Sequence, residues 1–559
     1  MNTISPALVT QRGARRLPRI PLLLLCAAYV LPGVFGRDPW RNADLAAFGP
    51  MVAMAEGRTP WFAPMLGGLP LDAAWLPHAL GAAFIAALSP FIEPAIAARV
   101  PFALLLALTL ALVWYSTFHL ARTEAAQPLA FAFGGEAEPI DYARAVADGA
   151  LLALLATLGL LQLGHETTPE LLQLFATALF MYGLAAAPYR RWQPRTALLV
   201  ALPLLGAAGA PSMAVAAGLV GAIVCSRSRL EGVPPFARWV LAATALTAAL
   251  ASASGWWQWR GAALDARGIA GIARQWLWFM WPAWLLALWT LWRWRRQLSF
   301  RHISVPLVAV GVALASNLFM GGSDRALMLG LPGLAVLAAF ALPTLKRSAS
   351  AAIDWFSMFF FSAWALVFWV HYLAMQTGFP PRPAANVARL TPGFTPSFSI
   401  VALAVALAGT AAWLALVRWR TGRQREAVWK SLVLPAGGVA LCWLLAMTLL
   451  LQPLDYLRSP RPFVERLARH IPAQTCVWAP GATPAAVAAL EHFGLWRVVA
   501  TAGADAPAGC DHQLRIVRQR PFAPAPSGWA AIAEVQRPTE RNEVTQVLRR
   551  IGAPPLSSP

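Results

Sequence analysis

About a dozen strongly apolar segments follow one another along the chain from Ile20 to Gln452. Each has close to the ~20 residues that an α-helix needs to cross the hydrocarbon core of a bilayer. The polar linkers between these segments are too short to form a soluble domain. The pattern therefore predicts a polytopic α-helical membrane domain over 20–452, preceded by a short N-terminal segment (1–19) and followed by a polar tail (453–559).

We expect about 13 membrane-spanning helices. Ile20–Gly36 is interpreted as a retained first helix and not as a cleaved signal peptide, because so many spans follow it. The others are expected at 97–120, 147–164, 170–187, 196–210, 211–226, 237–254, 275–292, 303–320, 326–344, 353–375, 398–417 and 432–452. Gly206–Pro211 leaves two alternatives open: it is a turn between two spans, or a break within one long helix.

The positive charges favour one orientation of this domain. Lys and Arg are concentrated in the N-terminal segment and in loops that follow every second span, including Tyr189–Arg191, Arg293–Arg296, Lys346–Arg347 and Arg418–Lys430. Cytoplasmic loops carry such an excess of basic residues. An odd number of spans then places the N-terminus in the cytoplasm and the tail on the outer side. The alanine- and arginine-rich composition indicates a Gram-negative bacterium, so we expect the inner membrane and a periplasmic tail.

Composition agrees with the membrane interpretation. Of the 559 residues, 58% are hydrophobic and only 13% are charged, and the mean hydropathy is +0.56. The formal net charge of +20 is spread between apolar segments and forms no single basic stripe. We therefore expect the basic residues to contact membrane lipids, and we expect no nucleic-acid partner.

The tail has a different pattern. Short strands are expected at Gln474–Trp478, Trp496–Thr501 and Gln513–Val517, and amphipathic helices at Pro484–Phe493 and Thr539–Ile551. A small α/β domain outside the membrane fits this pattern. A disordered tail is the alternative, because the segment 521–527 is rich in proline.

Cysteine usage bears on the compartment of the tail. Three of the five cysteines lie in apolar segments, and Cys476 and Cys510 are the two in the tail. An oxidising compartment favours pairing of such residues. We therefore expect a disulfide between Cys476 and Cys510, with two unpaired thiols as the alternative.

The longest loop between spans (37–96) holds the first polar candidates. Apolar residues follow Asp44 at helical spacing up to Glu56-Gly57, which predicts an amphipathic helix on the outer membrane face with a carboxylate near its start. The alternative for Asp44 is a helix-capping role. A second segment, Leu71–Leu88, contains Asp72 and His78 and is expected to be interfacial; His78 is more typical of a polar interfacial residue than of a metal ligand.

Two further loops place ionisable residues beside apolar helices on the same expected side. Glu166 and Glu170 lie between two spans, and Arg325 opens a later one. Ionisable residues in this setting are functional candidates, because a charge in the membrane is costly. The alternatives are that the acids only cap the next helix and that Arg325 only extends to the interface. The sequence contains no P-loop, no dinucleotide-binding glycine motif and no zinc-ligand spacing.

These motifs resemble those of integral-membrane glycosyltransferases with the GT-C fold, in particular the protein O-mannosyltransferases and aminoarabinose (lipid A) transferases of the family 39/83-like group. Three stretches carry the resemblance: Asn42–Gly57 with its acid Asp44, Pro64–Asp72, and Asp324–Ala335, which looks like the family's E-R-Y-x-L-P-x-L-P-x-L-A. The chain departs from the family in having Ala73 where a lysine usually follows the second acidic motif. The implied fold is an all-α polytopic membrane protein, GT-C-like with about 13 transmembrane helices and a small C-terminal α/β periplasmic domain.

The resemblance implies transfer of a sugar from a polyprenyl-phosphate donor to an envelope acceptor, which is lipid A, another glycan or a protein. Asp44 is then the catalytic base, Glu166 or Glu170 a second acid, and Arg325 and Arg41 ligands of the donor phosphate. We expect direct displacement with inversion by a monomeric enzyme. No cofactor is required, although a divalent metal between Asp44 and Glu170 is compatible with this chemistry. The alternatives are a transporter for a lipid-linked glycan and a non-catalytic envelope-assembly protein.

Overall fold

The computed structural model describes residues 5–40, 42–71, 74–258, 261–262, 265–422, 427–503, 506–517, 524–540 and 543–552. The chain divides into two compact units. Unit 1 comprises residues 1–33, 102–367 and 401–448; unit 2 comprises residues 34–101, 368–400 and 449–559. The long loop that follows the first helix therefore belongs to the same unit as the tail.

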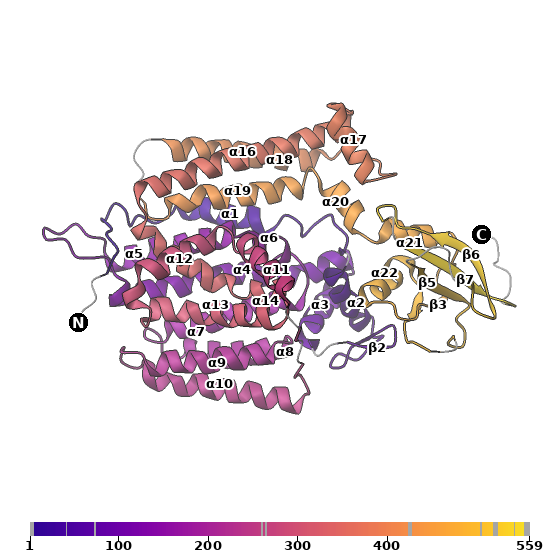
Figure 1. Cartoon of the computed structure of the whole chain (residues 1–559), viewed down its shortest axis with the longest axis horizontal. Coiled ribbons are helices and arrows are strands. Elements are labelled where there is room, and N and C mark those ends of the chain that lie inside the picture. Colours follow the sequence, from indigo (N-terminus) through magenta and orange to yellow (C-terminus); the bar gives the residue numbers. More distant parts are fainter. Residues whose placement is uncertain are drawn as a thin grey trace. The chain divides into compact units, whose positions relative to one another are not determined.

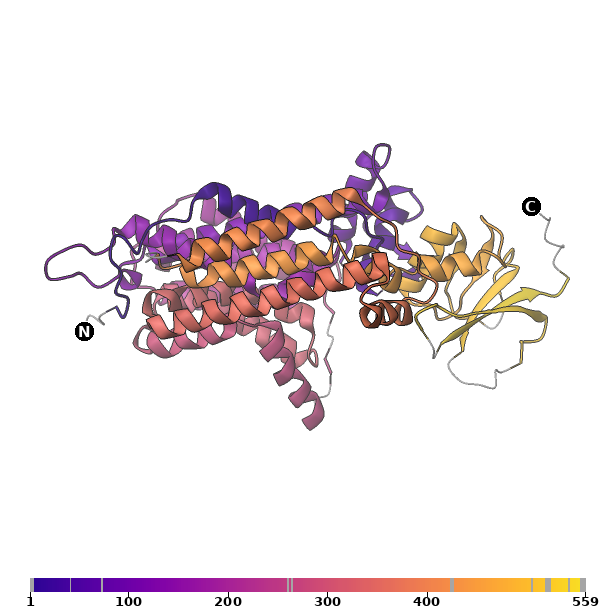
Figure 2. The same ribbon diagram turned by 90° about the horizontal axis from the view of Figure 1, so that it is seen from above.

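Unit 1 is built from helices that lie side by side (Figure 1). Its helices are α1 (Arg19–Val30), most of α4 (Pro94–Ala121), α5 (Pro139–Ala156), α6 (Leu158–Leu163), α7 (Pro169–Ala186), α8 (Gln193–Ala207), α9 (Pro211–Ser226), α10 (Val233–Ala253), α11 (Ala266–Phe279), α12 (Ala283–Arg293), α13 (Arg301–Phe319), α14 (Asp324–Met328), α15 (Leu331–Ala341), most of α16 (Arg347–Thr377), α18 (Ile400–Thr421) and α19 (Lys430–Ala446), with 3-10 turns η1 (Glu124–Ala126), η2 (Arg295–Gln297) and η3 (Leu342–Thr344). Helix α11 is inclined to the others (Figure 2).

Six of the described helices are long and apolar enough to cross a membrane, or up to seven if the bent pair α19 and α20 is one span. They are α4, α7, α10, α13, α16 and α18. Helices occupy the other expected spans too, but they are shorter or broken. The chain is therefore a multi-pass membrane protein.

The uncertain point at Gly206–Pro211 is a turn. Helices α8 and α9 both pack on the same stretch of α7: Gly183 of α7 lies against Leu198 of α8, and Gly221 of α9 lies against Phe180 and Leu184 of α7. Two helices can lie beside one stretch of a third only if the chain reverses between them. Residues 196–226 thus form two antiparallel helices.

Two expected spans are interrupted, and the interruptions hydrogen-bond to each other. The span expected at 147–164 breaks at Thr157 between α5 and α6, and the one expected at 275–292 breaks at Pro282 between α11 and α12. The Leu158 N–H donates to the Trp281 carbonyl oxygen over 3.0 Å. A Cβ on Gly159 would lie 2.6 Å from the Phe279 carbonyl oxygen, so only glycine permits this approach. Non-helical backbone within a membrane span is tolerated when protein groups satisfy its hydrogen bonds.

Unit 2 contains a five-stranded sheet with the order β4-β3-β5-β7-β6, in which β3 is parallel to β4 and β5 and the other pairs are antiparallel. Its elements are α2 (Ala43–Ala55), β1 (Met65–Leu66), β2 (Leu69–Pro70), α3 (Trp75–Leu88), α17 (Pro381–Leu390), α20 (Leu451–Arg458), α21 (Arg461–Leu467), β3 (Cys476–Trp478), α22 (Pro484–Gly494), β4 (Arg497–Val499), β5 (His512–Val517), β6 (Trp529–Val535) and β7 (Val544–Arg550). Helix α2 packs against α3 and α22. The tail is thus a folded α/β structure.

Two expectations for this unit are wrong. The helix expected at Thr539–Ile551 is strand β7, and β6 had not been expected. Apolar residues at Val544, Val547 and Leu548 have helical spacing, but β7 lies between β5 and β6, so that five consecutive residues are buried.

Helix α2 begins and ends as expected, yet nearly all of it is buried. A helix that is apolar all round is enclosed by protein, so α2 is not an amphipathic surface helix.

A disulfide joins Cys476 of β3 to Cys510, 34 residues later. In the chain-entropy description a loop of this length stabilises the folded state by about 2 to 4 kcal/mol. We expect the pair Cys476→Ser/Cys510→Ser to unfold at a lower temperature and to be cleaved faster in the tail by a protease. The control is Cys442→Ser, which removes a free cysteine. Equal proteolysis of the paired variant and the wild type would contradict this expectation.

Candidate functional site

Asp44 is a buried carboxylate in an ion pair. It lies in the first turn of α2, preceded by Asn42 in the left-handed region (φ 71°). Its Oδ2 accepts hydrogen bonds from Arg37 Nη1 over 2.9 Å and from the Trp40 backbone N–H over 3.1 Å. The Arg37 and Asp44 side chains are 2% and 3% exposed. Asp44 is therefore not the helix cap, and removing either partner would break a buried ion pair.

Arg37 is held in place by its own neighbours. Its guanidinium lies 4.6 Å from the centre of the Trp40 ring. Arg99 Nη1 donates to the carbonyl oxygens of Arg37, over 2.8 Å, and of Val34, over 3.3 Å. Arg37 was not among the residues predicted from the sequence, although it lies only seven residues before Asp44 in the same polar loop.

A second acidic pair anchors this loop to the first helix of the tail. Asp455 Oδ1 accepts from the Asp38 N–H over 3.0 Å and from Trp40 Nε1 over 2.9 Å. Asp38 accepts from Ser459 Oγ over 2.7 Å and from Arg461 Nε over 2.8 Å. Burial opposes the charged form of Asp38, but the hydrogen bonds from Arg461 and Ser459 hold its pKa below the usual value. Burial and the charge of Asp38 raise the pKa of Asp455.

His78 connects two helices of unit 2. Its Nδ1–H donates to the Ala47 carbonyl oxygen over 3.2 Å, which joins α3 to α2. The side chain is 7% exposed, and burial lowers its pKa to about 4. Arg41 and Asp72, which were also candidates, lie outside the described residues.

The neutral state of His78 predicts a dependence of stability on pH. The folded-state pKa lies below the ordinary value of 6.5, so stability is present above pH 6.5 and is lost as the pH falls toward 4. The loss is roughly 2 to 4 kcal/mol. Unfolding temperatures of the wild type should therefore fall more steeply from pH 7 to pH 4 than those of His78→Gln, whose amide can still donate to Ala47. If the unfolding temperatures of the two proteins fell equally with pH, protonation of His78 would not destabilise the fold.

The other candidates meet in unit 1. Arg325 Nη2 lies 2.6 Å from Glu166 Oε2, and its Nη1 lies 3.2 Å from Glu170 Oε2. Arg325 Nη1 also donates to Thr168 Oγ1 over 2.9 Å. Glu170 lies in the first turn of α7, and Glu166 and Thr168 lie in the loop before it. Arg325 lies in α14. The structure thus brings together three residues from two loops that the sequence singled out separately.

This cluster is partly exposed and ordered by its surroundings. The side-chain exposure is 21% for Arg325, 8% for Glu166 and 25% for Glu170. Gln162 Nε2 donates to Glu166 Oε1 over 3.0 Å. Burial disfavours the charge of Arg325, but the carboxylates of Glu170 and Glu166 raise its pKa. The guanidinium therefore stays charged and is held in one orientation, with the more exposed acid, Glu170, on one side of it.

The loop that carries Glu166 is fixed by the residue before it. His165 Nδ1 lies 2.6 Å from the Leu161 carbonyl oxygen, and its Nε2 lies 2.8 Å from the Tyr29 carbonyl oxygen. The ring also packs against Trp443, 4.5 Å between ring centres. His165 thus ties the loop to α1 and α19. Within the described residues, no group of three or more His, Cys, Asp or Glu side chains could hold a metal ion.

No protein-family model matches the chain, and no curated protein matches it. A crystal structure of ArnT from Cupriavidus metallidurans in the apo state has a TM-score of 0.60 at 14% identity, covering 95% of this chain and 97% of that one. ArnT from the same organism bound to undecaprenyl phosphate has a TM-score of 0.58 at 15% identity, with the same coverage.

This likeness extends over 95% of the chain. At 14 to 15% identity it establishes the fold and leaves the activity to be argued from the residues. The resemblance expected from the sequence is confirmed at this level: the chain has the ArnT-like GT-C fold.

Proposed function

We propose that this protein transfers a sugar from a polyprenyl-phosphate donor to an acceptor in the bacterial envelope. The observation that carries the proposal is the likeness to ArnT over 95% of the chain, including an ArnT structure bound to undecaprenyl phosphate. The acceptor is lipid A, another glycan or a protein. The inner membrane is the proposed location, with the N-terminus in the cytoplasm and the tail in the periplasm, because basic residues concentrate on the expected cytoplasmic side.

In the proposed reaction Asp44 is the general base. The acceptor hydroxyl oxygen attacks the anomeric carbon, the bond from that carbon to the phosphate oxygen breaks, and polyprenyl phosphate leaves. A hydroxyl is a weak nucleophile, so a carboxylate within hydrogen-bond reach must take its proton. Arg37 and the Trp40 N–H donate hydrogen bonds to Asp44 Oδ2 and fix its orientation. One displacement without an enzyme-bound intermediate inverts the anomeric configuration.

Arg325 is proposed to stabilise the phosphate as its charge develops. Planar guanidinium groups bind phosphate oxygens through two parallel hydrogen bonds. The pairs with Glu166 and Glu170 hold Arg325 in position before the donor arrives. We propose that Glu170, the more exposed of the two acids, also accepts a hydrogen bond from a sugar hydroxyl. A preformed cationic group lowers the barrier without reorganising during the reaction.

A structural role is the second reading of the same residues. Asp44 is 3% exposed and paired with Arg37, which would also suit a scaffold in envelope assembly. A transporter for a lipid-linked glycan is a third reading. Only the transferase consumes a sugar-phosphate lipid and produces free polyprenyl phosphate.

Lipid profiles of cells separate these readings. We would compare by mass spectrometry the polyprenyl-phosphate lipids and envelope glycans of cells with the wild-type protein and of cells without it. A transferase predicts that deletion makes a sugar-phosphate lipid accumulate while one envelope species loses the same sugar. An altered envelope with no change in any sugar-phosphate lipid would contradict the proposal.

A further inference from the structure

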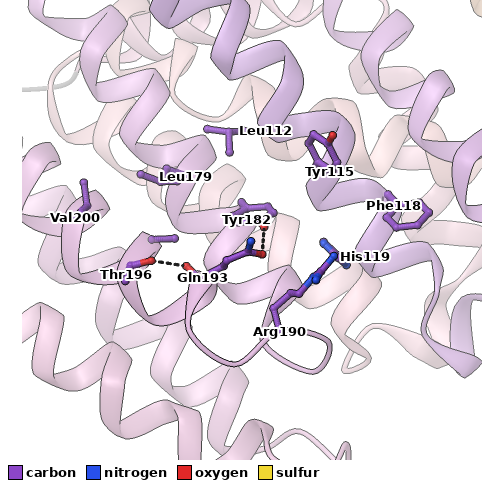
Figure 3. Close-up of a pocket in the computed structure, with 11 residues that line it drawn as sticks. Leu112, Tyr115, Phe118, His119, Leu179, Tyr182, Arg190, Gln193, Thr196 and Val200 are labelled. Carbon is purple, nitrogen blue, oxygen red and sulfur yellow. Dashed lines mark hydrogen bonds between the residues drawn. The ribbon is translucent and has the colours of Figure 1, made fainter. Parts of the chain in front are cut away.

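Unit 1 contains a pocket that the proposed reaction does not use. Its volume is about 690 Å³, and it is formed by the end of α4, the end of α7, the segment after α7 and the start of α8 (Figure 3). Glu170 and the Arg325 cluster lie at the other end of α7, which has 18 residues and is about 27 Å long at 1.5 Å per residue. The pocket is therefore separate from that cluster.

One half of the pocket is polar and the other half is apolar. The polar half is lined by His119, Tyr182, Arg190, Gln193 and Thr196, and the apolar half by Leu112, Leu179, Ala197 and Val200. Gln193 and Thr196 are oriented by hydrogen bonds: Tyr182 Oη donates to Gln193 Oε1 over 3.4 Å, and Thr196 Oγ1 donates to the Gln193 carbonyl oxygen over 3.0 Å (Figure 3). Such a lining suits an amphiphile with a polar head and an apolar chain.

His119 provides a buried polar group that lacks a protein partner. The residue is only 5% exposed, and among the described residues its Nδ1 has no hydrogen-bond partner. Its ring is stacked on Tyr189, with 5.4 Å between ring centres and an angle of 19°. A buried nitrogen without a partner costs about 1–3 kcal/mol. Nδ1 is closed to solvent, so a ligand in the pocket would contact the other ring nitrogen of His119.

The charge around the polar half is positive. Arg190 is exposed, makes no ion pair with any described residue and acts electrostatically on His119 together with Arg122. The Arg122 guanidinium lies 4.4 Å from the centre of the Tyr189 ring. No carboxylate is among the residues that line the pocket. The head group that fits is therefore an anion, and Arg190 is the donor available to it.

We propose that this pocket binds an anionic phospholipid of the surrounding membrane. The phosphate would lie between Arg190 and His119, and an acyl chain would follow Leu112, Leu179 and Val200 toward the middle of the bilayer. The proposed orientation has Tyr189–Arg191 on the cytoplasmic side, where anionic lipids give the membrane surface its negative charge. Binding at this position would bridge α4, α7 and α8, which all line the pocket.

The test measures lipid binding to the purified full-length protein in a neutral detergent. The unfolding temperature is followed against the concentration of phosphatidylglycerol, with phosphatidylcholine of the same chain length, inorganic phosphate and undecaprenyl phosphate as comparisons. Arg190→Gln should weaken apparent phosphatidylglycerol affinity at least about tenfold, the effect of one lost charge-assisted contact. The matched control is Arg191→Gln, which removes a neighbouring exposed arginine outside the pocket and should change affinity less than about twofold.

Three further variants test the pocket itself. Leu179→Trp should fill the apolar half and abolish stabilisation by phosphatidylglycerol, whereas Leu246→Trp, at an exposed position on α10, should not. Arg325→Gln should leave phosphatidylglycerol binding unchanged, which separates this site from the proposed reaction. The proposal is overturned by any of four results: equal effects of Arg190→Gln and Arg191→Gln, unchanged binding in Leu179→Trp, equal stabilisation by phosphatidylcholine or by inorganic phosphate, or a stabilisation by undecaprenyl phosphate that Leu179→Trp abolishes.

Discussion

Replacing Asp44 by asparagine is expected to lower the rate of sugar transfer by about a thousandfold, because a positioned general base contributes between 10² and 10⁴ to such reactions. Asparagine has nearly the shape of aspartate but cannot take the acceptor proton. The rate would be measured as release of polyprenyl phosphate from the sugar-phosphate lipid that accumulates in cells without the protein. The donor KM should change little, since Asp44 is assigned to the acceptor.

The design must separate catalysis from folding, because Asp44→Asn removes the carboxylate that pairs with buried Arg37. Breaking one side of a buried pair costs about 3–5 kcal/mol. The double variant Asp44→Asn/Arg37→Gln removes both charges and should recover most of the lost unfolding temperature. Under the proposed mechanism this variant stays inactive. Recovery of activity together with stability would show that Asp44 has only a structural role.

Replacing Arg325 by glutamine is the second large expected effect. Transfer should slow by about 10²- to 10³-fold, the usual cost of removing one group that stabilises developing negative charge. Arg325→Lys should restore only part of the rate, because an ammonium keeps the charge but cannot make two parallel hydrogen bonds. The kcat and KM for the donor would be measured separately; a fall in kcat indicates that Arg325 acts mainly in the transition state.

Two control variants separate a catalytic role of Arg325 from a structural one. Asp324→Asn removes a charge next to Arg325 that is in none of the cluster's ion pairs and should lower the rate no more than about threefold. Arg325→Gln/Glu166→Gln keeps the net charge of the cluster and should recover stability without recovering the rate. If the double variant were as active as the wild type, the cluster would serve only to hold two loops together.

The sequence predicted the helical architecture well because apolar length and charge are local properties. The prediction from sequence was wrong where contacts between distant residues determine the local structure. At the break beside Thr157, the Leu158 N–H donates to the Trp281 carbonyl oxygen, more than a hundred residues away. No periodicity within 147–164 can therefore reveal this break. Strand β7 has a helical pattern of apolar residues, and only its position between two other strands explains why all of its first five residues are buried.

The candidate site was predictable in part. Glu166, Glu170 and Arg325 attracted attention one at a time, as charges at the ends of apolar segments, but their pairing joins positions about 155 residues apart. Arg37 and Asp455 were missed, because charged residues in a polar loop and in a tail are ordinary by themselves. Their significance comes from burial and from the partners Asp44 and Asp38, which only the three-dimensional structure provides.

The central claim is that this chain consumes a polyprenyl-phosphate-linked sugar. The most direct measurement incubates the purified protein with the sugar-phosphate lipid from deletion cells and an envelope extract, and follows free polyprenyl phosphate by mass spectrometry. The account predicts release of polyprenyl phosphate by the wild-type protein, matched by gain of the sugar in one acceptor, and none above background by Asp44→Asn. Equal release by both proteins, or no release by wild-type protein that still restores the envelope of deletion cells, would contradict it.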